Sequence, residues 1–282
     1  MTALMTDKYC VIGNPIAHSK SPDIHAAFAL QTGEHIAYER CLAPIDDFAG
    51  TVHKLIAQGY RGANVTVPFK LQAAALATRL AERARLAGAV NTLSFVDGEI
   101  IGDNTDGPGL VADIVKNANV PLAGRRVLLL GAGGAVRGVI LPILQQGPEA
   151  IVIANRTRAT ADALVEHFAG QVARAGQVSA CNFEDIDGPF DVVINGTSAS
   201  LSAALPPVPA AAFCTGTLAF DMMYGKTPSP FMDFAARHGA LVRDGLGMLV
   251  EQAAEAFAIW RGVRPATTEI LDDMRSKLSN DN

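Results

Sequence analysis

The sequence contains no apolar segment long enough to cross a membrane. Its longest apolar runs, such as Val127–Leu130, are far shorter than the roughly 20 residues that a bilayer span needs. The start of the chain also lacks a basic stretch followed by an apolar one, so we expect no export signal. Basic residues are not in excess, since 23 Lys and Arg stand against 28 Asp and Glu. A face that binds duplex nucleic acid is therefore not expected.

Cysteine and histidine are sparse and scattered. The four cysteines form no CxxC pair: Cys10, Cys41, Cys181 and Cys214. A chain of this length needs no disulfide framework, so we expect small buried thiols and a cytoplasmic location, where thiols stay reduced. The six histidines form no HExxH or other two-ligand helical spacing, and we expect no metal site.

What is present indicates a globular α/β protein. The chain has 282 residues, of which 49% are hydrophobic and 18% charged, enough for one large domain or two ordinary ones. Strand-like apolar runs alternate with helical patterns from end to end. This alternation favours an α/β architecture with largely parallel sheets.

The first hundred residues or so predict one α/β unit. Ser21 followed by Pro22 is typical of a helix N-cap with proline at the first helical position, and Gly33 closes that helix. Asp97-Gly98 supplies the positive φ angles of a type I′ turn and predicts a hairpin. The predicted strands are 9–12, 62–67, 91–96 and 99–101, and the predicted helices are 21–32, 46–58 and an alanine-rich stretch from Pro68 to about residue 86.

A second unit begins near Asp106. Its strand 126–130 has the continuous apolar character that suits burial on both faces of a parallel sheet. Two helices follow the last strand. The predicted strands are 126–130, 151–154, 191–194, 218–221 and 241–243, and the predicted helices are 107–119, 135–146, 160–168, 228–238, 246–260 and 267–278.

A glycine-rich turn follows the strand 127–130 and precedes a helix. Gly131 and Gly133 permit a tight turn and a close approach of the backbone to a pyrophosphate, and the helix N-terminus favours its negative charge. The third glycine position of the general fingerprint holds Val136. The alternative is an ordinary strand–helix turn. The candidate pyrophosphate-binding residues are Gly131 and Gly133, with the N-terminus of the following helix.

The end of the next strand indicates which dinucleotide binds. NAD-specific proteins usually place Asp or Glu there, whereas arginine favours the 2′-phosphate of NADP. Here the segment reads Asn155, Arg156, Thr157, Arg158, so we predict NADP. The alternative is that both arginines simply face solvent at a helix start.

A hydride-transfer enzyme also needs a group that gives a proton to the carbonyl oxygen and takes it back in the reverse reaction. Lys70 and Asp106 are the candidates, with Asn91 as a third polar partner. Asn64 and Thr66 are polar groups that bracket the same strand end as Lys70. Spacing alone does not exclude a solvated surface lysine at residue 70.

Four other residues suit a polar substrate. Ser19 and Ser21 form a hydroxyl-rich turn at a helix start, which could bind a carboxylate or simply cap the helix. Tyr224 ends a strand and could reach the same carboxylate, or be a partly buried tyrosine. Gln252 is polar among apolar residues at helical spacing, which fits either a surface position or an amide directed into the site.

Taken together, these strings resemble the shikimate dehydrogenase family in their order along nearly the whole chain. Any one of them alone would be weak. The strings are GNPIAHSKSP (13–22), GANVTVPFK (62–70), GAVNTL (88–93), GDNTDGPG (102–109), GAGGAVRG (131–138), NRT (155–157), DMMY (221–224) and GLGMLVEQA (245–253).

The resemblance implies NADPH-dependent reduction of 3-dehydroshikimate to shikimate, with Lys70 and Asp106 as the catalytic pair. It implies substrate contacts from Ser19, Ser21, Thr66, Lys70, Asn91, Asp106, Tyr224 and Gln252. Asn64, at the same strand end as Thr66, is a further substrate-binding candidate. The resemblance places the pyrophosphate at Gly131, Ala132, Gly133, Gly134 and Ala135, and the adenosine phosphate at the segment from Asn155 to Thr160. Met222 and Gly245 would flank the nicotinamide, and Glu82 would lie near the cofactor.

The resemblance also implies two domains whose C-terminal helices return to the first. A substrate and catalytic domain would comprise residues 1–105 plus 246–282, and a Rossmann-type NADP-binding domain residues 106–245, with the active site between them. A homodimer is the partner arrangement to test. Three positions depart from the family pattern: Gly196 replaces alanine, Ser200 stands where glycine is common, and Thr160 replaces a basic residue.

Two other functions remain open at this stage. A quinate/shikimate dehydrogenase of the same superfamily would favour NAD and often carries threonine at the position of Ser21. A non-catalytic ligand-binding sensor on the same fold would keep the pocket and lose the proton-transfer pair. The presence of Arg156, Ser21, Lys70 and Asp106 places both behind a shikimate dehydrogenase.

Overall fold

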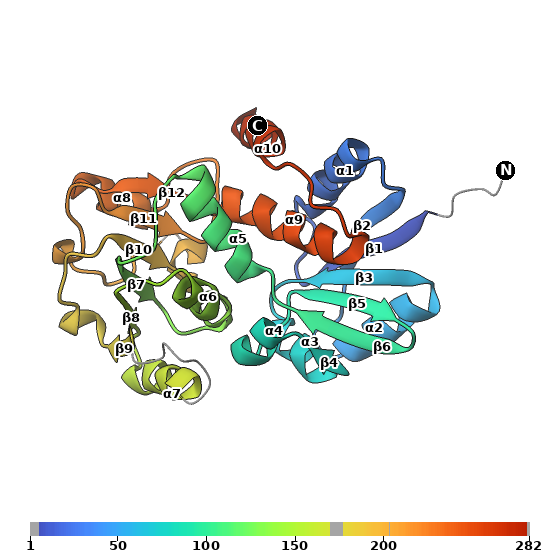
Figure 1. The fold of residues 1–282 in the computed structure, drawn as a ribbon, viewed down its shortest axis with the longest axis horizontal. Helices are drawn as coiled ribbons and strands as arrows, with labels where there is room; N and C mark the ends of the chain where they lie inside the picture. Colours follow the sequence, from blue (N-terminus) through green and yellow to red (C-terminus); the bar gives the residue numbers. More distant parts are fainter. Residues whose placement is uncertain (1–5, 170–176, 203, 281–282) are drawn as a thin grey trace.

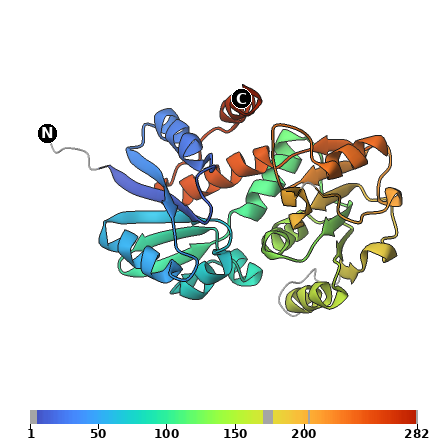
Figure 2. The same ribbon diagram turned by 180° about the vertical axis from the view of Figure 1, so that it is seen from behind.

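Two α/β units lie side by side, each built on a six-stranded sheet (Figures 1 and 2). The computed structural model describes residues 6–169, 177–202 and 204–280. Helices α5 (Asp106–Ala112) and α9 (Leu246–Arg261) run between the units. Within the described residues, no helix has the length and apolar character needed to cross a membrane.

The first sheet is mixed, as its order β2-β1-β3-β5-β6-β4 and strand directions show. Strand β5 is antiparallel to β3 and β6, and the other neighbouring strands are parallel. At the turn of the predicted hairpin, Asp97 has φ 51° and Gly98 has φ 82°, which confirms that turn. The strands are β1 (Asp7–Gly13), β2 (Ile36–Leu42), β3 (Tyr60–Val65), β4 (Arg79–Leu80), β5 (Thr92–Val96) and β6 (Glu99–Asp103).

The helices of this unit match the predictions with two exceptions. Helix α1 (Ser21–Thr32) and α2 (Phe48–Ala57) lie where expected, but the N-cap of α1 is Lys20, so the assignment of Ser21 as N-cap was wrong. Ser21 is instead buried as the first helical residue.

The expected long helix after Pro68 is interrupted. Helix α3 (Lys70–Leu76) and α4 (Glu82–Ala87) flank the two-residue strand β4. The Thr78 N–H donates to the Ile100 carbonyl at 2.8 Å, and the Ala81 N–H donates to the Gly102 carbonyl at 2.9 Å. Pairing with β6 therefore overrides the helical propensity of the alanines.

The second sheet is parallel throughout, in the order β12-β11-β10-β7-β8-β9. The strands are added outward from β7 to β9 on one side and from β10 to β12 on the other, so the strand order reverses between β7 and β10. In doubly wound sheets of this kind, ligands bind at the carboxyl ends of the strands at that point. Strand β9 was not among the predicted strands. The elements are β7 (Arg126–Leu130), α6 (Gly134–Gln145), β8 (Ala150–Ala154), α7 (Arg158–Ala169), β9 (Val178–Cys181), β10 (Val192–Asn195), β11 (Leu218–Asp221), α8 (Pro230–Arg237) and β12 (Leu241–Arg243).

The C-terminal helices return to the first unit, as the family resemblance implies. Helix α9 and α10 (Thr268–Asn280) share an apolar core with α1. Helix α5 continues as a π-helix over Asp113–Asn117, within the stretch expected to be one helix. A Cβ atom added at Gly109 of α5 would lie 2.6 Å from Cβ of Gln252, so glycine lets α5 and α9 approach closely.

One core residue of the first unit is a histidine. His25 of α1 is 0% exposed and stacks on Tyr38 with ring centroids 4.1 Å apart and planes at 6°. Within the described residues neither ring nitrogen has a hydrogen-bond partner. Burial lowers the pKa of His25 from 6.5 to about 3, against a smaller opposing effect of Asn64.

This low pKa predicts acid sensitivity. His25 takes up a proton below pH 6.5 in the unfolded chain but only near pH 3 in the fold, so its contribution to stability is complete above pH 6.5 and is lost as the pH falls toward 3. Between pH 7 and pH 5 the loss should be about 2 kcal/mol. Thermal unfolding at both pH values checks this. The His25→Leu variant should show a smaller difference between the two, and an equal difference in both proteins would contradict the assignment.

Candidate active site

The two predicted catalytic side chains meet at one edge of the first sheet. Lys70 is the first residue of α3, which follows β3, and Asp106 is the first residue of α5, which follows β6. The Lys70 Nζ atom lies 2.6 Å from Oδ2 of Asp106, and the two side chains are 22% and 9% exposed. Lys70 is therefore a paired residue of a sheltered site, which excludes the alternative of a solvated surface lysine.

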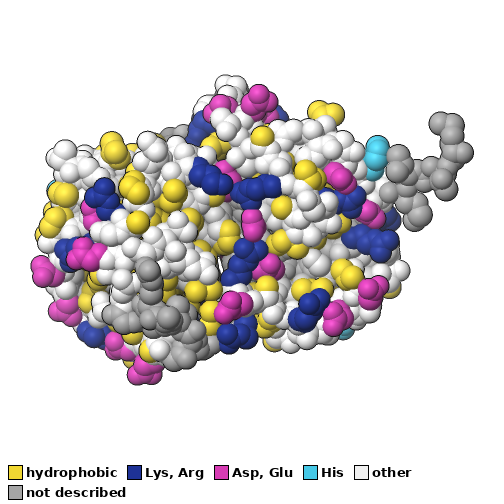
Figure 3. Space-filling model, viewed as in Figure 1, with side chains coloured by type: hydrophobic (Ala, Val, Ile, Leu, Met, Phe, Trp, Pro, Cys, Tyr) yellow, Lys and Arg dark blue, Asp and Glu magenta, His cyan; other side chains and the backbone are white. Residues whose placement is uncertain are grey.

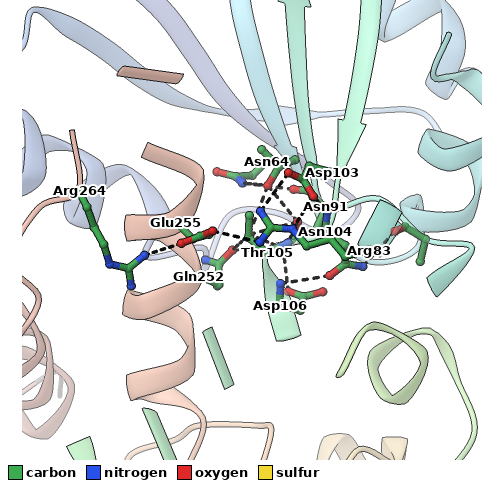
Figure 4. Close-up of polar contacts among 12 residues, drawn as sticks. Asn64, Arg83, Asn91, Asp103, Asn104, Thr105, Asp106, Gln252, Glu255 and Arg264 are labelled. Atoms are coloured by element: carbon green, nitrogen blue, oxygen red, sulfur yellow. Dashed lines mark hydrogen bonds and ion pairs between the residues drawn. The ribbon is translucent and has the colours of Figure 1, made fainter. Parts of the chain in front are cut away.

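Asn91 fixes the second oxygen of Asp106. Its Nδ2 donates to Oδ1 of Asp106 at 2.8 Å, and its Oδ1 accepts from the backbone N–H of Thr105 at 2.8 Å. The hydroxyl of Thr92 also donates to Asn91 Oδ1 at 2.9 Å. Because both ends of the amide are engaged, the Asp106 carboxylate is held in one orientation (Figure 4).

Gln252 and Asn64 belong to the same buried network. The Gln252 Oε1 atom lies 3.3 Å from Asn91 Nδ2 and 3.3 Å from the hydroxyl of Thr105. Gln252 is 9% exposed, which excludes the surface position that the sequence left open. On the other side, Asn64 Nδ2 donates to the Asn91 carbonyl at 3.2 Å, and its Oδ1 accepts from the Tyr38 hydroxyl at 2.7 Å.

The candidate carboxylate-binding residues lie at the start of α1. Ser19 Oγ accepts from the Ser21 N–H at 3.3 Å, and Tyr224 lines a small pocket with Lys20 and Leu246. Burial raises the pKa of Tyr224, which keeps its hydroxyl protonated as a hydrogen-bond donor. Thr66 is half-buried at the end of β3, and its N–H donates to the Ile12 carbonyl at 2.9 Å.

The glycine-rich turn leaves open space at the carboxyl end of β7. Gly131 has φ 100°, a backbone conformation that favours glycine. A Cβ atom added at Gly133 or Gly134 would have no atom within 4 Å, so a group can approach the backbone closely there. Helix α6 begins at Gly134, and its first N–H groups lack partners within the helix. This turn fits a pyrophosphate.

Val136 explains one departure from the family pattern. A Cβ atom added at Gly196 would lie 2.6 Å from Cγ2 of Val136 and 3.2 Å from Sδ of Met222. Valine at the third position of the fingerprint therefore occupies the space that alanine would need at residue 196. The side chain of Ser200, a second departure, lies outside the described residues.

The segment after β8 offers one uncommitted cation. Arg156 is exposed and, in the described ranges, has no ion pair or side-chain hydrogen bond. Arg158 is exposed too, but its Nε donates to Oδ1 of Asp162 at 3.0 Å. Asn155 Nδ2 donates to the Thr157 carbonyl at 2.9 Å, and Thr160 is exposed on α7. Arg156 is therefore the more available partner for a phosphate.

The remaining cofactor candidates lie in two places. Met222, which follows β11, and Gly245, which follows β12, are in contact, since a Cβ atom at Gly245 would meet the backbone carbonyl of Met222. Glu82 is exposed at the start of α4, the helix that packs against α6.

The catalytic pair and the glycine turn are joined by direct packing. A Cβ atom added at Gly107 would meet the Gly138 carbonyl and Pro142 of α6, and one added at Gly138 would lie 3.1 Å from the side-chain amide of Asn104. The start of α5, which carries Asp106, therefore rests on the helix whose N-terminus follows the glycine turn. Among the described residues, no cluster of His, Cys, Asp and Glu could hold a metal ion.

The sequence analysis did not predict four residues of this region. Tyr38 and Thr105 bind Asn64 and Asn91, and Arg83 forms an ion pair with Glu255 beside them. Thr105 lies inside the string GDNTDGPG and carried a signal by its position between Asn104 and Asp106. Tyr38 belongs to β2, a strand in which every residue is at least partly exposed, so its pattern did not predict a strand.

Comparison with known proteins identifies the family of the chain. Family models match residues 11–93 (shikimate dehydrogenase substrate binding domain), 113–204 (shikimate/quinate 5-dehydrogenase) and 245–274 (shikimate 5′-dehydrogenase C-terminal domain). A shikimate dehydrogenase (NADP(+)) from Janthinobacterium sp. (strain Marseille) is 59% identical over 97% of this chain and 98% of its own.

Solved structures show the same fold. The Ael1 enzyme from Pseudomonas putida is 48% identical, with a TM-score of 0.90 over 95% of this chain and 98% of its own. Shikimate 5-dehydrogenase from Thermus thermophilus, in complex with NADP(H) and shikimate, is 32% identical, with a TM-score of 0.86 over 97% of this chain and 100% of its own. With relatives of this identity along nearly its full length, the chain belongs to the shikimate dehydrogenase family.

Proposed function

We propose that this chain reduces 3-dehydroshikimate to shikimate with NADPH, and catalyses the reverse reaction, through Lys70 and Asp106. The observation that carries the proposal is the 2.6 Å pair between Lys70 of α3 and Asp106 of α5, the helix whose start rests against α6. The name of the Janthinobacterium relative supports both the reaction and NADP as its cofactor.

Bound NADPH supplies the hydride that reaches the carbonyl carbon. As the hydride arrives, negative charge develops on the carbonyl oxygen, and the Lys70 ammonium donates a proton to it. Asp106 accepts a hydrogen bond from Lys70, which holds the ammonium in position. In the reverse direction neutral Lys70 takes the proton from the hydroxyl. Because Asn91 holds the other Asp106 oxygen, the carboxylate needs little rearrangement during either step.

The proposed substrate site lies between α1 and the buried hydrogen-bond network around Asn91. Ser19, Ser21 and Tyr224 would hold the substrate carboxylate. The pocket that Tyr224 lines holds two lysines, Lys20 and Lys277, against one carboxylate, Asp23, a balance of charge that favours an anion there. Thr66 would lie near the substrate carboxylate, and Asn91 and Gln252 would meet the ring hydroxyls with Lys70 and Asp106. Asn64 is a further substrate-binding candidate beside Asn91. Hydroxyl groups of the substrate would be matched by amide and hydroxyl side chains, which suits a polyhydroxylated ring.

The proposed cofactor site follows the carboxyl ends of β7, β8 and β11. The turn Gly131–Ala135 would bind the pyrophosphate, Asn155 to Thr160 the adenosine phosphate, and Met222 with Gly245 the nicotinamide, with Glu82 nearby. Open space at Gly133 and Gly134 supports the first of these assignments. The uncommitted guanidinium of Arg156 supports the second.

We also propose a domain division, a location and an oligomeric state for this chain. The substrate domain comprises residues 1–105 and 246–282 and the cofactor domain residues 106–245, a division supported by the shared core of α1, α9 and α10. The location is cytoplasmic, supported by four free cysteines. A homodimer is a prediction that sedimentation at equilibrium would test.

The Lys70→Ala variant tests the catalytic assignment. Loss of the proton donor should lower kcat for shikimate oxidation by roughly 10²–10⁴-fold, the usual contribution of a general acid or base. Lys54→Ala is the matched control, since it breaks an exposed ion pair with Asp47 in the same unit and should leave kcat unchanged. Unchanged turnover of Lys70→Ala would remove Lys70 from the reaction.

The Arg156→Asp variant tests cofactor choice. A carboxylate at this position repels a 2′-phosphate, so the ratio of kcat/KM for NADP to that for NAD should fall by roughly 10- to 100-fold. Arg237→Asp in the last turn of α8 makes the same change of charge and should leave the ratio unaltered.

The same assays with quinate decide the alternative activity: better turnover of quinate with NAD than of shikimate with NADP would replace the proposed function.

A further inference from the structure

We infer that Arg83 and Glu255 are positioning residues that hold the loop Asp103–Asp106, and thereby the Asp106 carboxylate, in register with Gln252 on α9. This inference rests on the proposed function and goes beyond it, because among the described residues no hydrogen bond or ion pair joins either side chain to Lys70, Asp106 or the glycine turn. Figure 4 shows both side chains beside the catalytic network, and the basic and acidic side chains in Figure 3 gather where the two units meet.

Arg83 forms a bidentate ion pair with Asp103, the first residue of the loop. Its Nε donates to Oδ1 of Asp103 at 2.6 Å and its Nη2 donates to Oδ2 at 3.0 Å. The side chains are 25% and 15% exposed, so this bidentate pair is only partly screened by solvent. The pair fixes the direction in which the Asp103 carboxylate points.

The Asp103 carboxylate in turn fixes the backbone that leads to Asp106. Oδ1 of Asp103 accepts from the N–H of Asn104 at 2.7 Å. Oδ1 of Asn104 accepts from the N–H of Asp106 at 3.1 Å, and Nδ2 of Asn104 donates to the Ala89 carbonyl at 3.0 Å. These hydrogen bonds join residues one or two positions apart in the chain. A displacement of Asp103 would therefore also displace Asp106, the first residue of α5.

Glu255 ties the same guanidinium to α9. The Arg83 Nη1 atom donates to Oε1 of Glu255 at 3.0 Å, while Oε2 of Glu255 accepts from Arg264 at 2.5 Å. Glu255 lies three residues after Gln252, so the two side chains project from the same face of α9. One turn of α9 therefore reaches the loop in two ways, directly through Gln252 at Thr105 and indirectly through Glu255, whose partner Arg83 binds Asp103.

Arg264 extends the ion pairs along α9. Its Nη2 donates at 2.8 Å to Oε2 of Glu251, whose side chain is 3% exposed. Oε1 of Glu251 accepts from Asn117 at 3.2 Å, and Asn117 donates to Asp113 at 2.9 Å. The Asp113 side chain, 0% exposed, pairs with Arg243 of β12. The loop that carries Asp106 is thus linked through α9 to the sheet of the second unit.

Kinetics of Arg83→Gln and Glu255→Gln test the inference. Each variant should lower kcat for shikimate oxidation by roughly 10-fold or more, since small displacements of a catalytic group are costly. Each should also shift the pH profile of kcat and raise KM for shikimate, while the Kd for NADP stays unchanged. Arg83→Lys should recover only part of the activity, because an ammonium does not reproduce the bidentate geometry. The double variant should lose little more than either single one.

Arg79→Gln is the matched control. Arg79 of β4 pairs with Glu99 at 3.3 Å in the same sheet, but its side chain is 61% exposed and does not touch the loop. Its kcat and pH profile should equal those of the wild type. Thermal unfolding is measured for every variant, and Glu255→Gln carries the test if Arg83→Gln is not folded, since it removes a charge and keeps the size.

The outcomes separate the two proposals. A wild-type enzyme without shikimate oxidation would refute the proposed function and the inference with it. An active wild type together with folded Arg83→Gln and Glu255→Gln variants of unchanged kcat and pH profile would refute the inference alone. A loss of activity in proportion to the loss of folded protein, with an unchanged pH profile, would also refute it.

Discussion

One buried amide, that of Asn91, joins the segments from which the active site is built. Its nitrogen lies within hydrogen-bonding distance of Asp106, Thr105 and Gln252, and its oxygen accepts from the Thr105 backbone. The strand β5, the helix α5 and the helix α9 therefore converge on this side chain. An unsatisfied polar group at such depth is costly, so the network is stable only when all its members are in place. The position of Asp106, and through it that of Lys70, depends on this arrangement.

The sequence predicted the strands of the second sheet well because most of them are buried on both faces. Arg126–Leu130 and Leu218–Asp221 are such strands and lie where the pattern placed them. Leu241–Arg243 also lies where it was predicted, although it is an exposed edge strand. It did not predict β2, an edge strand whose residues are all at least partly exposed, or β4, where pairing with β6 interrupts an alanine-rich stretch. Non-local hydrogen bonds decide these cases, and they leave no periodic signal in the sequence.

The site was predicted unevenly for a similar reason. Lys70 and Asp106 lie 36 residues apart in the chain, and this spacing does not indicate that they are in contact. The needs of hydride transfer made them candidates, and the family resemblance implied that they form a pair. Arg83 and Glu255 carried no signal, since charged residues on helices usually face solvent. Their role is visible only once the fold places α4 and α9 on either side of the loop Asp103–Asp106.

A crystal structure with NADP and shikimate both bound tests the central claim most directly. The account predicts that the Lys70 ammonium and the Asp106 carboxylate both lie within about 2.6–3.2 Å of the one hydroxyl oxygen whose carbon faces the nicotinamide. A structure in which that hydroxyl contacts other side chains, with Lys70 and Asp106 remote from it, would contradict the account.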